Sequence, residues 1–228
     1  MDKNNFRKWN EEMAAKYNPE LFHDSANIFI RWIEGKRVKR IIASASAYKG
    51  KGVLEVGCGA GNILEKIPFG KLFGIDISDA LLKRAQIRLS NKAYLLLGNA
   101  EIMPFKDKTF DIAICSEVIE HTQNPGVLLE NISNILKPEG KLIISIPNEK
   151  LINALKKIYF FISIFRQNTL HKDTKYRIAK KMDDEWHLHE FQINDFIGLL
   201  KKNFIVNRVC RIPYYFLPVR YVILCSKG

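Results

Sequence analysis

The sequence has no long apolar run. None of its 228 residues belongs to a stretch that approaches the ~20 consecutive apolar residues of a membrane-spanning helix. The first residues, MDKNNFRKWNEEM, have no apolar core of the kind that a secretory signal peptide carries. We therefore expect a cytoplasmic protein. With 47% hydrophobic residues, the chain has enough apolar surface for one sizeable core, and we expect a single domain.

Cysteines are few and scattered. The chain has four, Cys58, Cys115, Cys210 and Cys225, and no two of them form a CxxC pair. Three fall in or beside apolar strand patterns, which is typical of reduced, buried thiols. The sequence therefore predicts no zinc site built from cysteine.

A glycine-rich stretch from Val53 to Asn62, VLEVGCGAGN, predicts a buried strand that leads into a tight turn before a helix. Glycine lets the backbone approach a ligand closely, and the free N–H groups of a following helix favour a negative group. The third glycine comes one residue earlier than in the dinucleotide fingerprint G-x-G-x-x-G. Glu55 beside the turn disfavours a pyrophosphate and suits an ammonium or sulfonium ligand such as S-adenosylmethionine. The alternative is that the glycines only shape the turn.

A second short apolar strand, KLFGIDIS from Lys71 to Ser78, ends in an acid, Asp76. The distance along the chain from Gly61 to Asp76 fits one intervening helix. In a βαβ nucleotide site, an acid at this place accepts hydrogen bonds from the ribose hydroxyls. The alternative for Asp76 is an ordinary turn residue or helix N-cap.

Five motifs in order resemble those of the class I S-adenosylmethionine-dependent methyltransferases, particularly the small-molecule group that includes quinone-biosynthesis enzymes. They are VLEVGCGAG, GIDIS, GNAEIMPF, FDIAICSEVIEH and LKPEGKLIISIPN. The resemblance is specific from Val53 to Pro147 and looser from Tyr17 to the C-terminus. It implies a Rossmann-like α/β fold: a seven-stranded, mostly parallel sheet whose last strand is antiparallel, with helices on both faces. It also implies S-adenosyl-L-methionine as the cofactor.

The resemblance further implies the residues that bind this cofactor. They are Glu55, Gly57, Cys58, Gly59, Gly61, Asp76, Ile77, Asn99, Ala100, Glu101, Ser116 and Glu117. In similar enzymes the leading helices cover the cofactor, and an aromatic near Tyr17 closes over it; core packing is the alternative for Tyr17. Asn99 replaces the usual aspartate at the adenine edge, where its amide oxygen can still accept a hydrogen bond. Arg31 and Arg37 are both candidates for the cofactor carboxylate.

The strand from Phe110 to Cys115 precedes the reacting centre, because ligands of open α/β sheets lie beyond the carboxyl ends of the strands. Enzymes that methylate exocyclic amines of bases carry an [ND]-P-P-[YF] motif after this strand, and this chain has CSEV. Base methylation is therefore disfavoured. His121, four residues after Glu117, is a candidate general base, with a local structural role as the alternative.

The run DDEWHLHEF places His187 and His189 two residues apart. In an extended segment both imidazoles point to one side, so either is a candidate base that deprotonates an acceptor hydroxyl. A divalent metal site needs a third ligand, which this run does not clearly offer, and we predict no metal.

The segment from Lys150 to Lys181 carries nine Lys or Arg residues against one acid, Asp173. Its apolar residues recur at helical spacing, which predicts an amphipathic basic cap over the substrate mouth. Three interpretations follow: a packed cap with a solvated face, a contact with a membrane surface, or a nucleic-acid patch. The aromatic run KIYFFISIF favours a membrane surface over nucleic acid.

We expect helices at residues 6–17, 22–47, 80–89, 128–136 and 193–202, a helix that begins at residue 62, and terminal strands at 204–212 and 221–225. The chain then divides into an N-terminal helical cover (1–50), a cofactor-binding core (51–147), the basic cap (148–190) and a C-terminal helix with a strand pair (191–228). The predicted function is methyl transfer to the oxygen of a small, apolar acceptor. The alternatives are an RNA or protein methyltransferase that uses the cap, and a cofactor-binding scaffold or sensor without turnover. Oligomeric state is not predicted.

Overall fold

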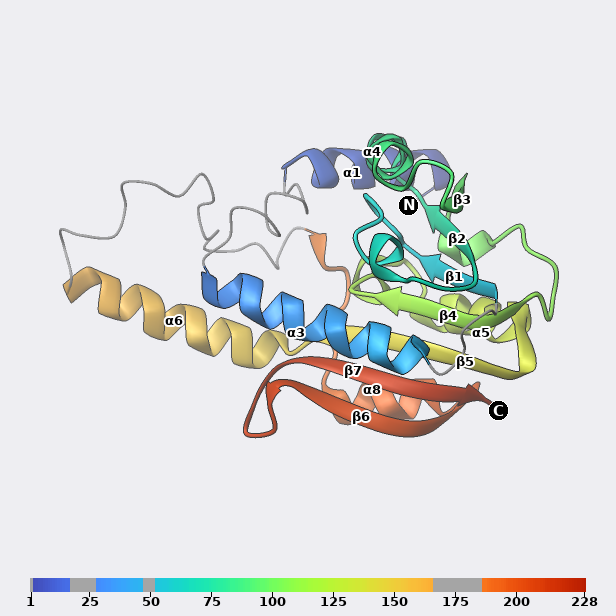
Figure 1. The fold of residues 1–228 in the computed structure, drawn as a ribbon. Helices are drawn as coiled ribbons and strands as arrows, with labels where there is room; N and C mark the ends of the chain where they lie inside the picture. The colour runs from blue at the N-terminus through green and yellow to red at the C-terminus, as the bar shows by residue number, and fades with distance from the viewer. Residues whose placement is uncertain (1, 17–27, 47–51, 166–185) are drawn as a thin grey trace.

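One seven-stranded sheet organises the molecule (Figure 1). The computed structural model describes residues 2–16, 28–46, 52–165 and 186–228. The strands lie in the order β3-β2-β1-β4-β5-β7-β6. Their bounds are Gly52–Val56 (β1), Lys71–Asp76 (β2), Ala93–Leu97 (β3), Phe110–Ser116 (β4), Leu136–Pro147 (β5), Phe204–Tyr214 (β6) and Leu217–Lys227 (β7). The first five strands pair in parallel, whereas β7 is antiparallel to β5 and β6. This confirms the predicted sheet.

Helices cover both faces of the sheet (Figure 1). The α-helices are α1 (Lys3–Lys16), α3 (Ile28–Ala45), α4 (Asp79–Leu89), α5 (Pro125–Ile135), α6 (Glu149–Phe165) and α8 (Ile193–Leu200). Three short 3₁₀ turns follow strands: η2 (Leu64–Lys66), η3 (Ala100–Ile102) and η4 (Ile119–His121). The predicted ends of α3 and of the N-terminal helix extend into residues 17–27 and 47, which lie outside the described part of the chain.

Alternation along the strands divides the core into two layers. Leu54 on β1 packs in a layer with α5 and α8, while its neighbour Val53 packs in a layer with α3 and α4. On β4, Ala113 and Ile114 divide between the same two layers. Successive strand residues point to opposite faces, so a nearly continuous apolar strand can be buried on both sides.

The chain reverses its direction of travel across the sheet between β1 and β4. It passes from β1 to β2 and β3 on one side, and from β4 to β5 on the other. The carboxyl ends of β1 and β4 therefore flank a topological switch point, where open α/β sheets bind ligands. Glu55 and Ser116 lie at these two ends.

The expected helix that begins at residue 62 is wrong. The glycine turn leads only to the 3₁₀ turn η2, and the chain becomes extended at Ile67, whose ψ is 115°. Pro68 explains this early end, because the residue before a proline is pushed out of the helical region.

The four cysteines are free thiols. Cys58, Cys115 and Cys225 are buried as predicted, whereas Cys210 on β6 is only half-buried, contrary to the prediction. Among the described residues, no helix is both long and apolar enough to cross a membrane. Of the predicted basic cap, the structure describes the helix α6 and the end from residue 186, while residues 166–185 lie outside the described part.

Candidate active site

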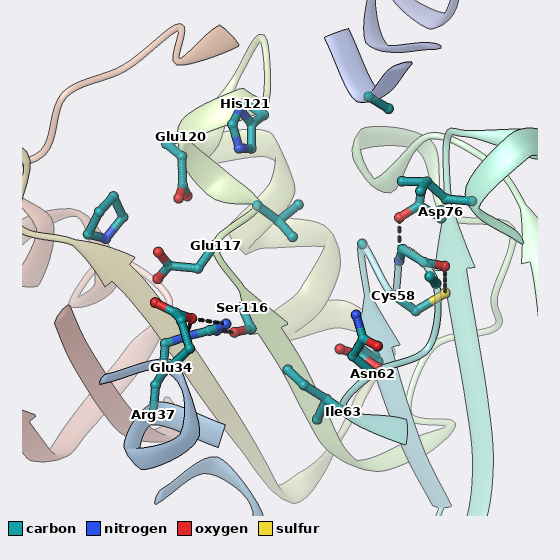
Figure 2. A pocket seen from close by; sticks show the side chains of 18 of the residues that line it. Glu34, Arg37, Cys58, Asn62, Ile63, Asp76, Ser116, Glu117, Glu120 and His121 are labelled. Carbon is teal, nitrogen blue, oxygen red and sulfur yellow. Dashed lines mark hydrogen bonds and ion pairs between the residues drawn. The ribbon is translucent and has the colours of Figure 1, made fainter. Parts of the chain in front are cut away.

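A pocket of about 910 Å³ lies at the carboxyl ends of β1, β2 and β4 and is also lined by residues of α1, α3 and α6. Figure 2 shows its two ends. Cys58 and Asp76 stand on one side, and Glu117, Glu120 and His121 stand on the other. We call these the glycine end and the histidine end.

The glycine end is shaped by backbone that side chains would obstruct. Gly57, Gly59 and Gly61 have φ values of 68°, 50° and 79°, in the left-handed region. A Cβ built on Gly57 would lie 2.3 Å from a methyl carbon of Val118, whereas one on Gly59 would meet nothing closer than 4.0 Å. Gly59 therefore presents its backbone directly to the pocket that it lines.

Asp76 is fixed by the turn that it faces. Its Oδ2 accepts a hydrogen bond from the N–H of Gly59 at 2.7 Å, and its Oδ1 accepts one from the N–H of Ser78 at 2.9 Å. Burial raises the pKa of Asp76, and the two backbone donors oppose that rise. The carboxylate lines the pocket in a fixed orientation, so it can accept hydrogen bonds from ligand hydroxyls.

Glu55 is a buried acid at the glycine end. Its side chain is 3% exposed, and its Oε2 has no hydrogen-bond partner among the described residues. Burial raises the pKa of Glu55 to about 8. A cationic group in this pocket would supply the missing partner. The open glycine backbone, the orphaned carboxylate oxygen and the fixed Asp76 together fit the predicted cofactor, which carries hydroxyls and positive charge.

Helix α1 closes over this end through Glu11. Its Oε1 accepts a hydrogen bond from the N–H of Asp79 at 2.6 Å, and its Oε2 accepts one from the Oγ of Ser78 at 2.7 Å. Both donors belong to the start of α4, where an acidic side chain is favoured by the orphan N–H groups and the helix dipole. Glu11 thus attaches the cover helix to the pocket.

The histidine end rests on a buried network of charges. Arg37 of α3 forms an ion pair with Glu34 at 2.8 Å and donates a hydrogen bond to the Oγ of Ser116 (Figure 2). On the opposite side, Nε of Arg220 lies 2.8 Å from Oε2 of Glu117. Glu117 itself has a φ of 55°, an uncommon conformation for a residue with a side chain. Its Oε1 accepts a hydrogen bond from Ser145 at 2.9 Å, which holds the carboxylate in place.

Two histidines and a buried acid converge beside this network. His121 and His187 contact each other, with ring centroids 4.7 Å apart. Nδ1 of His121 donates to the carbonyl oxygen of Trp186 at 3.1 Å, since a carbonyl can only accept, and this leaves the lone pair on Nε2. Burial and the neighbouring His187 lower the pKa of His121 to about 3. His121 is therefore a neutral imidazole that also holds the 186–189 segment.

His187 forms a dyad with the buried carboxylate of Glu149, at 2.7 Å between Nδ1 and Oε1. With His187 neutral and the carboxylate oxygen as acceptor, Nδ1 carries the proton and Nε2 the lone pair. Burial raises the pKa of Glu120 to about 8, and its Oε2 has no hydrogen-bond partner in the described part of the chain. The cluster of Glu120, His121 and His187 offers ligand atoms that all lie within 4.8 Å of one another. The sequence argument had only His187 and His189 as ligands; in the structure the group of three consists of His187 with both Glu120 and His121.

Most residues predicted to contact the cofactor line this pocket: Glu55, Gly57, Cys58, Gly59, Asp76, Ile77, Asn99, Ala100, Ser116 and Glu117. Gly61 and Glu101 are not among the lining residues. A Cβ on Gly61 would meet Leu89 at 2.8 Å, so this glycine permits turn and helix to pack together. Glu101 accepts from the N–H of Gln123 instead. Tyr17 lies outside the described residues.

One further expectation needs correction. His189 does not share the pocket with His187: it is absent from the lining, and its ring stacks on Phe191. The segment there is irregular instead of extended, so alternate residues need not share a side. Asn99 lines the pocket, and its Oδ1 also acts as an N-cap that accepts from the N–H of Glu101 at 2.8 Å. The second lone pair of this oxygen stays available for an adenine amino group, so that role remains a prediction.

Sequence reasoning missed four charged residues of the histidine end. They are Glu34, Glu120, Glu149 and Arg220. Glu34 and Arg37 are spaced i,i+3 on a helix, a signal for a pair on one face. Arg220 gave no local signal, because only the pairing of β7 with β5 brings it close to Glu117, which follows β4. The structure also places Arg37 at the pocket with its head group bound to Glu34 and Ser116.

Comparison with known proteins shows what this chain is similar to. A family model described as a methyltransferase domain matches residues 54–144. A ubiquinone biosynthesis O-methyltransferase of Glaesserella parasuis is 30% identical over 180 residues, which cover 70% of this chain and 74% of that protein. A ubiquinone/menaquinone biosynthesis C-methyltransferase of Pasteurella multocida is 30% identical over 125 residues, or 50% of this chain and 47% of that one. The chain thus spans about half the length of this second relative.

The fold recurs in solved structures. Magnesium protoporphyrin IX methyltransferase of Synechocystis PCC 6803, solved with bound SAH, superposes with a TM-score of 0.70 over 100% of both chains. Because the two sequences are only 16% identical, this likeness concerns the fold alone.

Proposed function

Because the chain belongs to the class I S-adenosylmethionine-dependent methyltransferases, we propose that it transfers a methyl group to the oxygen of a small, apolar acceptor. S-Adenosylmethionine occupies the glycine end in this proposal, and the acceptor occupies the histidine end. The observation that carries the choice of oxygen is the convergence of Glu120, His121 and His187 in the cofactor pocket.

The walls of the pocket support an apolar acceptor. Phe29, Ile30 and Ile33 of α3 contribute to its lining, and Ile152 and Leu155 of α6 do so as well. Transfer of an apolar part of the acceptor from water onto such walls is favourable. The acceptor hydroxyl would then be the polar group that turns toward the histidine end.

The cofactor, when bound, supplies a methyl group that its sulfonium already activates. The protein's task is to hold the acceptor oxygen in line with that methyl carbon, which can contribute about 7–11 kcal/mol in favourable cases. As the new C–O bond forms, the C–S bond breaks and the hydroxyl proton must leave. Nε2 of His187 is the proposed destination, because the dyad with Glu149 fixes the proton on Nδ1.

The same cluster supports a second way to lose that proton. The acids Glu34, Glu117 and Glu149 outnumber the guanidiniums Arg37 and Arg220 at this end, even while Glu120 keeps its proton. A divalent cation held by Glu120, His121 and His187 would offset this excess and lower the pKa of a bound hydroxyl. A chelator distinguishes the two routes, because only the second needs a cation.

The test is transfer of a labelled methyl group from S-adenosylmethionine to phenols and quinols with alkyl tails of different lengths. We compare wild type with His187→Gln, and use His189→Gln as the matched control, because His189 does not line the pocket. His187→Gln should lower turnover by about 10²–10⁴-fold, and the control should not. Cofactor affinity should be unchanged in both variants.

The products decide the remaining points. A methyl ether identified by mass spectrometry supports the proposal. If the ether still forms after exhaustive removal of divalent ions, His187 accepts the hydroxyl proton without help from a metal. If chelation abolishes turnover and one added cation restores it, the hydroxyl proton leaves by the metal-assisted route. A product methylated at carbon would contradict the choice of oxygen. Label that enters only RNA or protein would contradict the choice of a small acceptor.

A further inference from the structure

An exposed aromatic cluster lies away from the chemistry of the pocket. It consists of Phe29 and Trp32 on α3 and Tyr214, Tyr215 and Phe216 at the turn between β6 and β7; we call it the aromatic patch. The exposed fractions are 50% for Phe29, 76% for Tyr215 and 80% for Phe216. Ile28, at the start of α3, is 76% exposed beside it. Exposed apolar side chains that occur singly are ordinary, whereas a contiguous group marks an interaction surface.

Four rings of the patch, those of Phe29, Trp32, Tyr214 and Phe216, form one continuous row. Phe29 stacks on Trp32 with centroids 5.6 Å apart, and Trp32 lies 5.6 Å from Tyr214. Tyr214 stacks on Phe216 at 5.4 Å with only 2° between the ring planes. A helix and a hairpin, distant in the sequence, therefore present a single aromatic surface.

The fold does not require these aromatics. Tyr215 and Phe216 form the two-residue connection between β6 and β7, since Tyr214 pairs with Leu217 across the hairpin. Asparagine and glycine are common in such short turns, and neither Tyr215 nor Phe216 has a positive φ, so the turn accepts many residue types. Large apolar side chains at this position are exposed to water and stabilise little.

Positive charge surrounds the patch. Nζ of Lys36 lies 4.5 Å from the ring centroid of Trp32 and 4.9 Å from that of Tyr214, and the guanidinium carbon of Arg211 lies 4.5 Å from that of Tyr215. Strands β6 and β7 contain no Asp or Glu, and α3 contains only Glu34. That acid is buried and paired with Arg37 and Arg220, so it does not offset the charge of this face.

The patch adjoins the pocket. Phe29 belongs to both, and Lys156 of α6 also lines the pocket. In Figure 1 the start of α3, the free end of α6 and the β6–β7 turn lie toward the same end of the molecule. A partner surface that bound this end of the molecule would therefore lie next to an apolar part of the pocket wall.

We propose that the aromatic patch docks on a membrane surface that carries anionic lipids. Tyrosine and tryptophan favour the boundary between headgroups and acyl chains, where an apolar ring and a polar tip are both accommodated. Lysine and arginine beside them are attracted to anionic headgroups, and their apolar stems lie along the rings. This proposal does not depend on the methyl acceptor, because docking needs neither cofactor nor substrate.

The test is co-sedimentation with vesicles of phosphatidylcholine alone and of phosphatidylcholine with phosphatidylserine. The main variant, Tyr215→Asn/Phe216→Gly (the Asn-Gly variant), removes both rings and keeps residue types that are common in two-residue turns. Phe216→Ser is a second, smaller change. Ile87→Ser is the matched control, because Ile87 is 83% exposed on α4, far from the hairpin turn in Figure 1. Circular dichroism and melting curves check the fold of each variant.

Wild type should bind the anionic vesicles more tightly than the neutral ones, with affinity that falls as salt rises. The Asn-Gly variant should lose at least about tenfold in affinity, Phe216→Ser should lose less, and Ile87→Ser should match wild type. No binding by folded wild type would overturn the proposal, as would equal binding by the folded Asn-Gly variant. A dimer in sedimentation velocity that needs the patch, without vesicle binding, would overturn it too and assign the patch to a second copy of the chain.

Discussion

The backbone N–H of Gly59 donates a hydrogen bond of 2.7 Å to Oδ2 of Asp76. This contact joins the turn after β1 to the end of β2, so the two parts of the predicted cofactor site hold each other before any ligand binds. A site that is already ordered loses less conformational entropy when its ligand arrives. The glycine end is therefore pre-organised by its own backbone.

The fit between Gly57 and Val118 leads to a stability prediction. Gly57→Ala should destabilise the protein by about 2–4 kcal/mol, because alanine is strained at positive φ and its Cβ would collide with Val118. Urea unfolding measures the loss. The double variant Gly57→Ala/Val118→Ala should be less destabilised than the sum of the single variants, because the smaller side chain removes the collision. Strict additivity would show that the collision does not matter.

Glu55 should make stability fall with rising pH. The unfolded chain releases this proton near pH 4.5, whereas burial raises the pKa of Glu55 in the folded protein to about 8. Between these values the folded state carries more protons, so the free energy of unfolding declines as pH rises, by up to about 1.4 kcal/mol per pH unit. Glu55→Gln should flatten this slope in urea unfolding between pH 5 and 8, and Glu139→Gln, at an exposed site, should not. An unchanged slope in Glu55→Gln would contradict the assignment.

The same acid predicts how cofactor affinity depends on pH. If the ammonium or sulfonium of the cofactor is the missing partner of Glu55, binding favours the ionised carboxylate and should strengthen from pH 6 toward pH 8. Calorimetry in buffers of different ionisation enthalpy would detect the released proton. Titration with S-adenosylhomocysteine, which has the ammonium but no sulfonium charge, tells which of the two groups contacts Glu55. If its affinity depends on pH as strongly as that of S-adenosylmethionine, the contact is with the ammonium. No pH effect in wild type would contradict a role for Glu55 in binding.

Glu11 predicts that helix α1 can be detached from the pocket without unfolding the sheet. Glu11→Ala removes both hydrogen bonds to the start of α4 and should cost about 1–2 kcal/mol. Limited proteolysis should then cut the chain near α1 faster than in wild type. Glu12→Ala is the matched control, since its neighbouring side chain is exposed. Equal cleavage of both variants would mean that apolar contacts, and not Glu11, hold the helix.

The sequence predicts those parts of the site whose residues lie close together in the chain and follow a recognisable spacing. Glycines at alternate positions, with an acid after the next apolar strand, led to Gly57, Gly59 and Asp76, and all three line the pocket. The apolar strands likewise predicted a mostly parallel sheet. These features depend on residues close in sequence, and simple sterics and periodicity suffice to recognise them.

The histidine end could not be predicted in the same way. His187 meets Glu149 and His121 only because an irregular segment crosses the carboxyl end of β4, where the carbonyl oxygen of Glu120 accepts hydrogen bonds from the N–H groups of Leu188 and His189. A periodicity argument assumes a regular segment, and it wrongly placed His187 and His189 together. Long-range contacts of this kind depend on tertiary packing.

The central claim, that the glycine end binds S-adenosylmethionine, is tested most directly by calorimetric titration of that cofactor into wild type and Asp76→Ala. Asp107→Ala, at an exposed loop acid, is the control. We predict saturable, micromolar binding by wild type and by the control, and a loss of at least about tenfold in Asp76→Ala. Absence of binding by well-folded wild type would contradict the claim.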